Sequence, residues 1–292
     1  MNNAPDDFGQ FEQGLRRVLW VLREYLNDIV VIGGWVPYLY RKYGGFSEWR
    51  SSLSRTGEVD VLLGSSLETR GRKAMTVILS EAGFLPRTDA RRAAVWIGDV
   101  EQGEQIEFLA PHKGAAKQIG QLQPIESQHG LGAISLPGLE LLLEFTKKLG
   151  LPVALEGQAA VELEIRVPWL GAYLANKAAT FPKRRSIAAV PAMENPKQAK
   201  DLLYVRDLAA AGEEVTQCLS EDCTTIRSAG KRDEHRMDYA ASNLGLLEGG
   251  TFAAELEEAA EMLAERDGMR HQEALADLRG HLRDARELLE GT

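Results

Sequence analysis

The chain has 292 residues, which is enough for two ordinary domains or for one domain with a large extension. Hydrophobic residues make up 44% and charged residues 26%, without an apolar run of membrane-spanning length, so we expect a cytoplasmic protein with no membrane partner. The net charge of −9 argues against a generally nucleic-acid-binding surface, and two cysteines are too few for a disulfide framework.

Strands and helices are mixed over the first part of the chain. Apolar periodicity and the positions of glycine and proline distinguish helices from strands here. The expected helices cover residues 8–26, 35–43, 67–82 and 137–150, and the expected strands cover 29–32, 58–63, 94–97, 105–109 and 161–167. The strands at 94–97 and 105–109 form a hairpin in this prediction, and residues 44–57 form a loop.

The pattern changes at Pro168, after which only helices are expected. The predicted helices cover 169–180, 197–211, 214–228, 231–247, 252–267 and 270–290. This shift predicts an α+β domain at residues 1–167 and a helical domain at residues 168–292. The last 42 residues hold 11 acidic residues and 5 arginines, so the negative charge is concentrated there. Basic clusters at 70–73, 87–92 and 183–185 are compatible with a local basic surface in the first 250 residues.

Two carboxylates alternate along the strand Glu-Val-Asp-Val-Leu-Leu. Successive strand residues point to opposite faces, so Glu58 and Asp60 share one face while Val59 and Val61 point into the core. Neighbouring carboxylates repel each other unless a cation lies between them, and such oxygen ligands suit Mg²⁺. Taken alone, this pattern is more often the solvated face of a half-exposed strand.

Two further features accompany this strand. Gly33 and Gly34 lie between an apolar strand and a helix, where glycine lets the backbone approach a ligand and a helix N-terminus attracts anions. Taken alone, the pair is better explained by a tight turn that needs glycine for its φ angle. Glu107 interrupts the later apolar strand and faces away from Ile106 and Phe108.

In this order, Gly33-Gly34, Glu58-Val59-Asp60 and Glu107 resemble the pattern of the nucleotidyltransferase superfamily. The resemblance implies a polymerase-beta-like mixed sheet with flanking helices, in which the three carboxylates bind metal and the glycine turn binds nucleotide. Thr56, preceded by an arginine, is similar to a lead-in found in bacterial members, and it is assigned to the nucleotide site on that basis. The sequence departs from the family in having Glu58 and Glu107 where aspartate is more common, and in a longer gap after Gly34.

A second resemblance covers Arg166-Val167-Pro168, residues 173–177 and residues 197–207, which are similar to AbiEii-type toxins of type IV toxin–antitoxin systems and to related bacterial proteins. It implies that Lys177 contacts phosphate from the helical domain. It also implies that Lys200 and Asp201 complete that side of the nucleotide site, with Asp201 orienting either a lysine or the nucleotide.

These resemblances imply a Mg²⁺- or Mn²⁺-dependent enzyme that moves a nucleoside monophosphate from an NTP to a hydroxyl of RNA (tRNA included), a protein or a small molecule. A toxin or phage-defence role, with an antitoxin partner, is the biological setting they imply. Two alternatives stay open. One is a degenerate member that binds nucleotide, RNA or protein without transfer, and the other is an interaction protein that binds through its acidic C-terminal helices.

Overall fold

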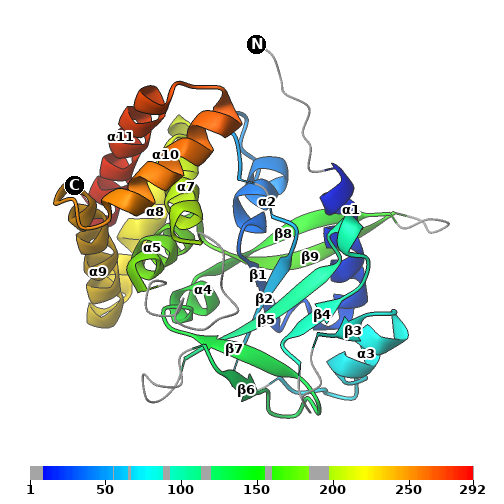
Figure 1. Cartoon of the computed structure of the whole chain (residues 1–292). Helices are drawn as coiled ribbons and strands as arrows, with labels where there is room; N and C mark the ends of the chain where they lie inside the picture. Colours follow the sequence, from blue (N-terminus) through cyan, green and yellow to red (C-terminus); the bar gives the residue numbers. More distant parts are fainter. Residues whose placement is uncertain are drawn as a thin grey trace. The chain divides into compact units, whose positions relative to one another are not determined.

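The computed structural model describes residues 9–54, 56–64, 67–87, 93–112, 120–154, 160–183 and 197–291 (Figure 1). The chain folds into two compact units. The first comprises Met1–Leu39 and Arg55–Pro168, and the second comprises Tyr40–Ser54 and Trp169–Thr292. The second unit therefore includes a segment that precedes most of the first unit in sequence, and the predicted division at residue 167 stays a prediction. Within the described ranges, none of the helices combines the length and the apolar character needed to cross a bilayer.

A mixed sheet forms the centre of the first unit (Figure 1). The strand β2 (Val59–Leu63) lies between β1 (Ile29–Ile32), which is antiparallel to it, and β5 (Gln105–Pro111), which is parallel. On its other edge, β5 pairs with β4 (Val95–Ile97) in its first half and with β7 (Gly132–Leu136) in its second half. The short strands β3 (Leu85–Pro86) and β6 (Leu122–Pro124) pair with β4 and β7. Since β1 is buried along its whole length and β2 buries all its apolar residues, these two strands lie at the core.

Helices and a long hairpin complete the first unit. The helices are α1 (Gly9–Val21), the start of α2 (Trp35–Tyr43), α3 (Met75–Glu81) and α4 (Glu140–Glu144), with 3-10 turns at Arg23–Tyr25 and Val100–Gln102. The strands β8 (Thr146–Val153) and β9 (Val161–Pro168) pair over eight residues, and β9 packs against β1. The predicted strands at 29–32, 58–63, 94–97, 105–109 and 161–167 are confirmed within two residues at each end.

The predicted helix at 137–150 is wrong over most of its length. Only Glu140–Glu144 is helical, and residues 146–153 form β8 instead. Leu149, Leu151 and Val153 are buried at alternate positions while the residues between them are more exposed, which is the period of a strand. Pairing with β9 therefore decides the structure of a segment whose apolar residues also fit a helix.

One further prediction needs correction, and the structure also contains strands that the sequence did not predict. The helix expected at 67–82 begins only at Met75, because Arg70 and Gly71 both adopt positive φ angles, of 49° and 81°, that an α-helix excludes. The strands β6 and β7 were not predicted. Both strands are short, and β6 ends in a proline while β7 begins with a glycine. Proline and glycine are disfavoured inside strands, so the local sequence gives only a weak strand signal.

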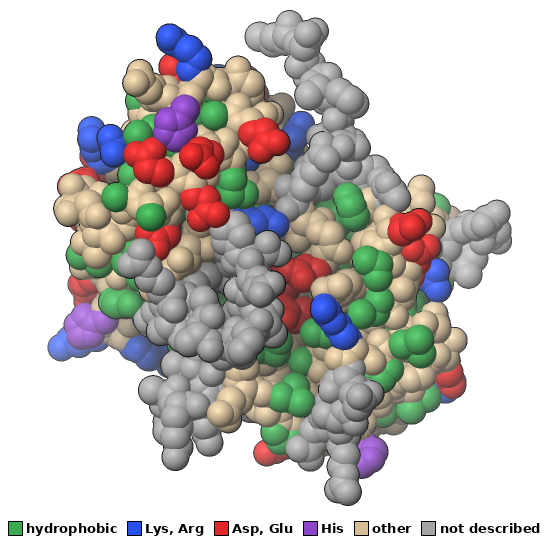
Figure 2. Space-filling model, viewed as in Figure 1, with side chains coloured by type: hydrophobic (Ala, Val, Ile, Leu, Met, Phe, Trp, Pro, Cys, Tyr) green, Lys and Arg blue, Asp and Glu red, His purple; other side chains and the backbone are tan. Residues whose placement is uncertain are grey.

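The second unit is helical, as predicted. It contains α5 (Leu170–Thr180) with a 3-10 turn at Phe181–Lys183, α7 (Lys197–Ala209), α8 (Glu213–Ala229), α9 (Lys231–Glu248), α10 (Ala253–Asp267) and α11 (His271–Glu290). The first nine residues of α5 are all buried, so this helix lies at the centre of the unit. Figure 2 shows acidic side chains gathered on this unit over α10. The mixed sheet with flanking helices, followed by helices alone, confirms the predicted α+β fold class.

A buried charge cluster lies within the second unit. Asp207 on α7 is fully buried and accepts hydrogen bonds at 2.7 and 2.8 Å from Arg266 of α10. Burial raises the pKa of Asp207, while the guanidiniums of Arg266 and Arg206 oppose that rise by stabilising the carboxylate. The hydroxyl of Ser51 donates to the Asp207 carbonyl at 2.6 Å, so the cluster also holds the segment Tyr40–Ser54.

We expect Asp207→Asn to destabilise the protein by about 3 kcal/mol, because Arg206 and Arg266 lose the carboxylate that lies between them and keep only their partners Asp267 and Asp277. Urea unfolding followed by circular dichroism measures the change. The control is Asp238→Asn, which removes a more exposed partner of Arg227 and should cost less than about 1 kcal/mol. Equal losses in the two variants would contradict the assignment of Asp207 as the centre of a buried cluster.

Candidate active site

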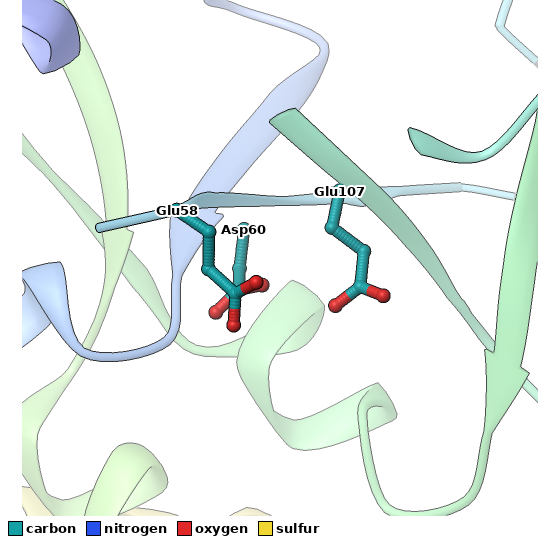
Figure 3. Close-up of side chains that lie close together, drawn as sticks. All are labelled: Glu58, Asp60 and Glu107. Atoms are coloured by element: carbon teal, nitrogen blue, oxygen red, sulfur yellow. The ribbon is translucent and has the colours of Figure 1, made fainter. Parts of the chain in front are cut away.

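Three carboxylates converge on one face of the central sheet. Asp60 on β2 and Glu107 on β5 are directly opposite each other in the parallel register, and Glu58 lies two residues before Asp60. Residues directly opposite on neighbouring strands point to the same face, as do residues two apart. One ligand oxygen from each of the three lies within 4.8 Å of the others, and Figure 3 shows the side chains on the same side of the strands.

The glycine turn meets the carboxylates at Asp60. Ile32, the last residue of β1, is paired with Asp60, so Gly33 follows directly beside it. Gly33 has a φ of +73°, and a Cβ added there would lie 1.8 Å from Asp60 Oδ2. Both the backbone conformation and the space therefore require glycine. Gly34 then leads into α2, in whose first turn Val36 N donates a hydrogen bond to the Gly33 carbonyl at 3.3 Å.

Gln105 is a site residue that the sequence did not predict. Its Nε2 donates to Glu58 Oε2 at 3.1 Å. Gln105 lies two residues before Glu107 on β5, so both point to the face that carries the cluster. The signal was available in the sequence, because a polar residue two positions from a strand carboxylate shares its face.

The donor set fits a divalent cation. All three residues offer hard carboxylate oxygens, and all three are half-buried, so their mutual repulsion is screened less than on an open surface. Oxygen ligands of this kind suit Mg²⁺ or Mn²⁺, which neutralises the clustered negative charge.

Thr56 has a local structural contact. Its side chain is buried, and its hydroxyl donates to the Glu58 carbonyl at 3.3 Å. This contact fixes the backbone where the chain enters β2. The assignment of Thr56 to the nucleotide site stays a prediction.

In the helical unit, Lys177 is buried and ordered by its neighbours. Its Nζ donates to Asp201 Oδ1 at 2.8 Å, and it lies 4.8 Å from the ring centre of Tyr204 and 5.5 Å from that of Tyr173. Lys200 Nζ lies 5.9 Å from the Tyr204 ring centre. The structure thus brings Lys177, Lys200 and Asp201 together around Tyr204. Their action on nucleotide, and the action of Lys177 together with the carboxylates, stay predictions.

We expect Gly33→Ala to weaken Mn²⁺ binding on the order of 10-fold, because the new Cβ forces the Asp60 carboxylate out of the cluster. Isothermal titration with Mn²⁺ measures the affinity. The control is Gly83→Ala, since Gly83 has a similar φ of +87° but open space at its Cβ position. That variant should lose about 1 kcal/mol of stability from its backbone strain and keep its affinity. Unchanged Mn²⁺ affinity in Gly33→Ala would show that Asp60 is not a ligand or tolerates the shift.

The family comparison agrees with this arrangement. The sequence model of a nucleotidyltransferase family matches residues 17–226, which include Gly33, the three carboxylates and Lys177. Searches of curated proteins and of solved structures gave no significant match. Because the family match covers well over half of the chain and contains the carboxylate cluster, the protein belongs to the nucleotidyltransferase family.

Proposed function

We propose that this protein is a metal-dependent nucleotidyltransferase that moves a nucleoside monophosphate from an NTP to an acceptor hydroxyl. The observation that carries the proposal is the convergence of Glu58, Asp60 and Glu107 beside the Gly33 turn, in a chain of this family. A solvated strand face explains one or two such acids. It does not explain three carboxylates gathered within 4.8 Å beside a glycine whose missing side chain makes room for one of them.

In the proposed reaction, the acceptor oxygen bonds to the α-phosphorus of the NTP, the bond from that phosphorus to the bridging oxygen breaks, and pyrophosphate leaves. The hydroxyl proton passes to water. Glu58, Asp60 and Glu107 would hold one or two Mg²⁺ ions, which when bound would neutralise charge on the reacting phosphates. The backbone at Gly33-Gly34 and the start of α2 receive the phosphates, because a glycine turn admits a ligand closely and a helix N-terminus attracts anions. Catalysis then consists mainly of positioning and charge neutralisation.

Lys177 is proposed as a phosphate contact supplied by the helical unit. The support for this role is its ion pair with Asp201, which holds the ammonium in one place and so lowers the entropy lost when it binds phosphate. Asp201 is thereby proposed as the residue that orients the lysine, and Lys200 as a neighbouring phosphate contact.

For the acceptor, we propose a hydroxyl of RNA (tRNA included), of a protein or of a small molecule. The likeness of residues 166–207 to AbiEii-type toxins favours a toxin or phage-defence role with an antitoxin partner. Incubation of the purified protein with each labelled NTP, Mg²⁺ and a cell extract, before and after ribonuclease or protease, identifies the labelled class. Label in none of the fractions, together with no pyrophosphate release, would favour the degenerate nucleotide-binding protein, for which the two glutamates in place of aspartates are the argument.

We expect Asp60→Asn to lower the transfer rate about 10³-fold or more, because a charged metal ligand is lost where phosphate charge develops. Stability without metal should be unchanged or slightly higher, since one source of carboxylate repulsion is gone. Pyrophosphate release and a thermal melt without Mg²⁺ measure the two effects. The control is Glu164→Gln, which neutralises an exposed carboxylate on β9 and should transfer normally. Near wild-type transfer by Asp60→Asn would refute the assignment.

Lys177→Met tests whether the lysine is only structural. The single variant should be destabilised, because Asp201 is left buried without its ion-pair partner. Lys177→Met combined with Asp201→Leu should regain most of that stability, since no unpaired charge remains. We expect transfer to stay at least about 10-fold below wild type in the double variant. Recovery of both stability and transfer would show that the ion pair serves the fold alone.

A further inference from the structure

We propose that Gln105 is a positioning residue that holds the Glu58 carboxylate in the metal-binding cluster. This inference rests on the proposed function, since it names a second residue that the same site requires. It is carried by the hydrogen bond from Gln105 Nε2 to Glu58 Oε2, at 3.1 Å.

The backbone fixes the Gln105 side chain opposite Glu58. Val59 on β2 pairs with Ile106 on β5, so Glu58 and Gln105 precede that pair on the two strands. Gln105, the first residue of β5, also pairs with Ile97 of β4, which holds its backbone in the sheet. A side chain carried by a strand of the sheet is a more rigid support than one on a loop.

The chemistry explains why Glu58 needs such a support. Glutamate has one methylene more than the aspartate common at this position, and therefore one more rotatable bond to fix. The carboxylates of Asp60 and Glu107 lie close by and repel Glu58, which favours conformers that point away from the cluster. A hydrogen bond to the ionised group opposes both effects.

An amide is well suited to this position. It donates without adding negative charge to a cluster of three carboxylates, and it carries no positive charge to compete with a metal ion. A carboxylate has about four lone-pair sites, so Glu58 can accept from Gln105 and still bind a cation. Gln105 thus compensates for the longer side chain of Glu58. The longer side chains of Glu58 and Glu107 are the main argument for a degenerate site.

The test measures Mn²⁺ affinity by titration calorimetry, in the full chain and without nucleotide. We expect Gln105→Ala to bind Mn²⁺ about 10-fold more weakly than wild type, which is the usual effect of removing a group that orients a metal ligand. The matched control is Gln102→Ala. Gln102 donates to Asp99 Oδ2 at 3.2 Å, so this variant removes a similar glutamine–carboxylate bond outside the cluster. It should bind Mn²⁺ as wild type does.

A double-variant cycle shows whether Gln105 acts through Glu58. In the Glu58→Gln background, adding Gln105→Ala should change Mn²⁺ affinity less than about 2-fold, because the group it orients has already lost its charge. A thermal melt without metal shows whether each variant is folded. If Gln105→Ala unfolds, Gln105→Asn, whose arm is too short for the bond, is measured instead and should show the same loss.

The proposal is overturned if Gln105→Ala keeps wild-type affinity, or if its effect is unchanged in the Glu58→Gln background. It is also overturned if the wild type does not bind Mn²⁺, an outcome that removes the metal site of the proposed function as well. Wild-type binding that depends on Gln105, in a protein that releases no pyrophosphate with any NTP, would refute the proposed transfer and leave the positioning role intact.

Discussion

The site depends on the register of β2 between its two neighbours. The antiparallel pair Ile32–Asp60 places Gly33 against the Asp60 carboxylate, and the parallel pair Asp60–Glu107 places the third carboxylate on the same face. A slip of one residue would turn Asp60 into the core and Val59 outward. The buried apolar residues of β2 oppose that slip, so the same pattern that forms the core also aligns the carboxylates.

Gathering carboxylates in one place opposes folding, and the surrounding structure offsets that cost. Each of the three acids lies on or beside a strand whose alternate residues are buried, so the sheet remains stable while its other face carries the charge. Gly33 makes room for Asp60, and Gln105 holds Glu58 through a neutral amide. In the proposed metal site, these contacts would keep the oxygens in place before a cation binds, which is the condition for tight binding of a small ion with strict geometry.

In the helical unit, buried acidic side chains are paired with basic side chains. Asp207 is paired with arginines deep inside it, and Asp201 is paired with Lys177. Pairs of this kind contribute little net stability, but removal of one partner is costly because it leaves a buried charge without its counterion. The Asp207 cluster also holds the segment Tyr40–Ser54, which comprises the end of α2 and most of the predicted loop at residues 44–57.

The sequence by itself determined the helices of the second unit, the strands β1, β2 and β5, and the face that each carboxylate occupies. Those features follow from local periodicity, which one stretch of chain contains in full. Only the tertiary structure decided that residues 146–153 form a strand, because the deciding contacts come from β9. It alone brought Gln105 to Glu58 and Ser51 to Asp207, since those contacts join residues 47 and 156 positions apart. The sequence predicts which face of its strand or helix a residue occupies. The pairing of strands and the packing of helices determine which other residue it contacts.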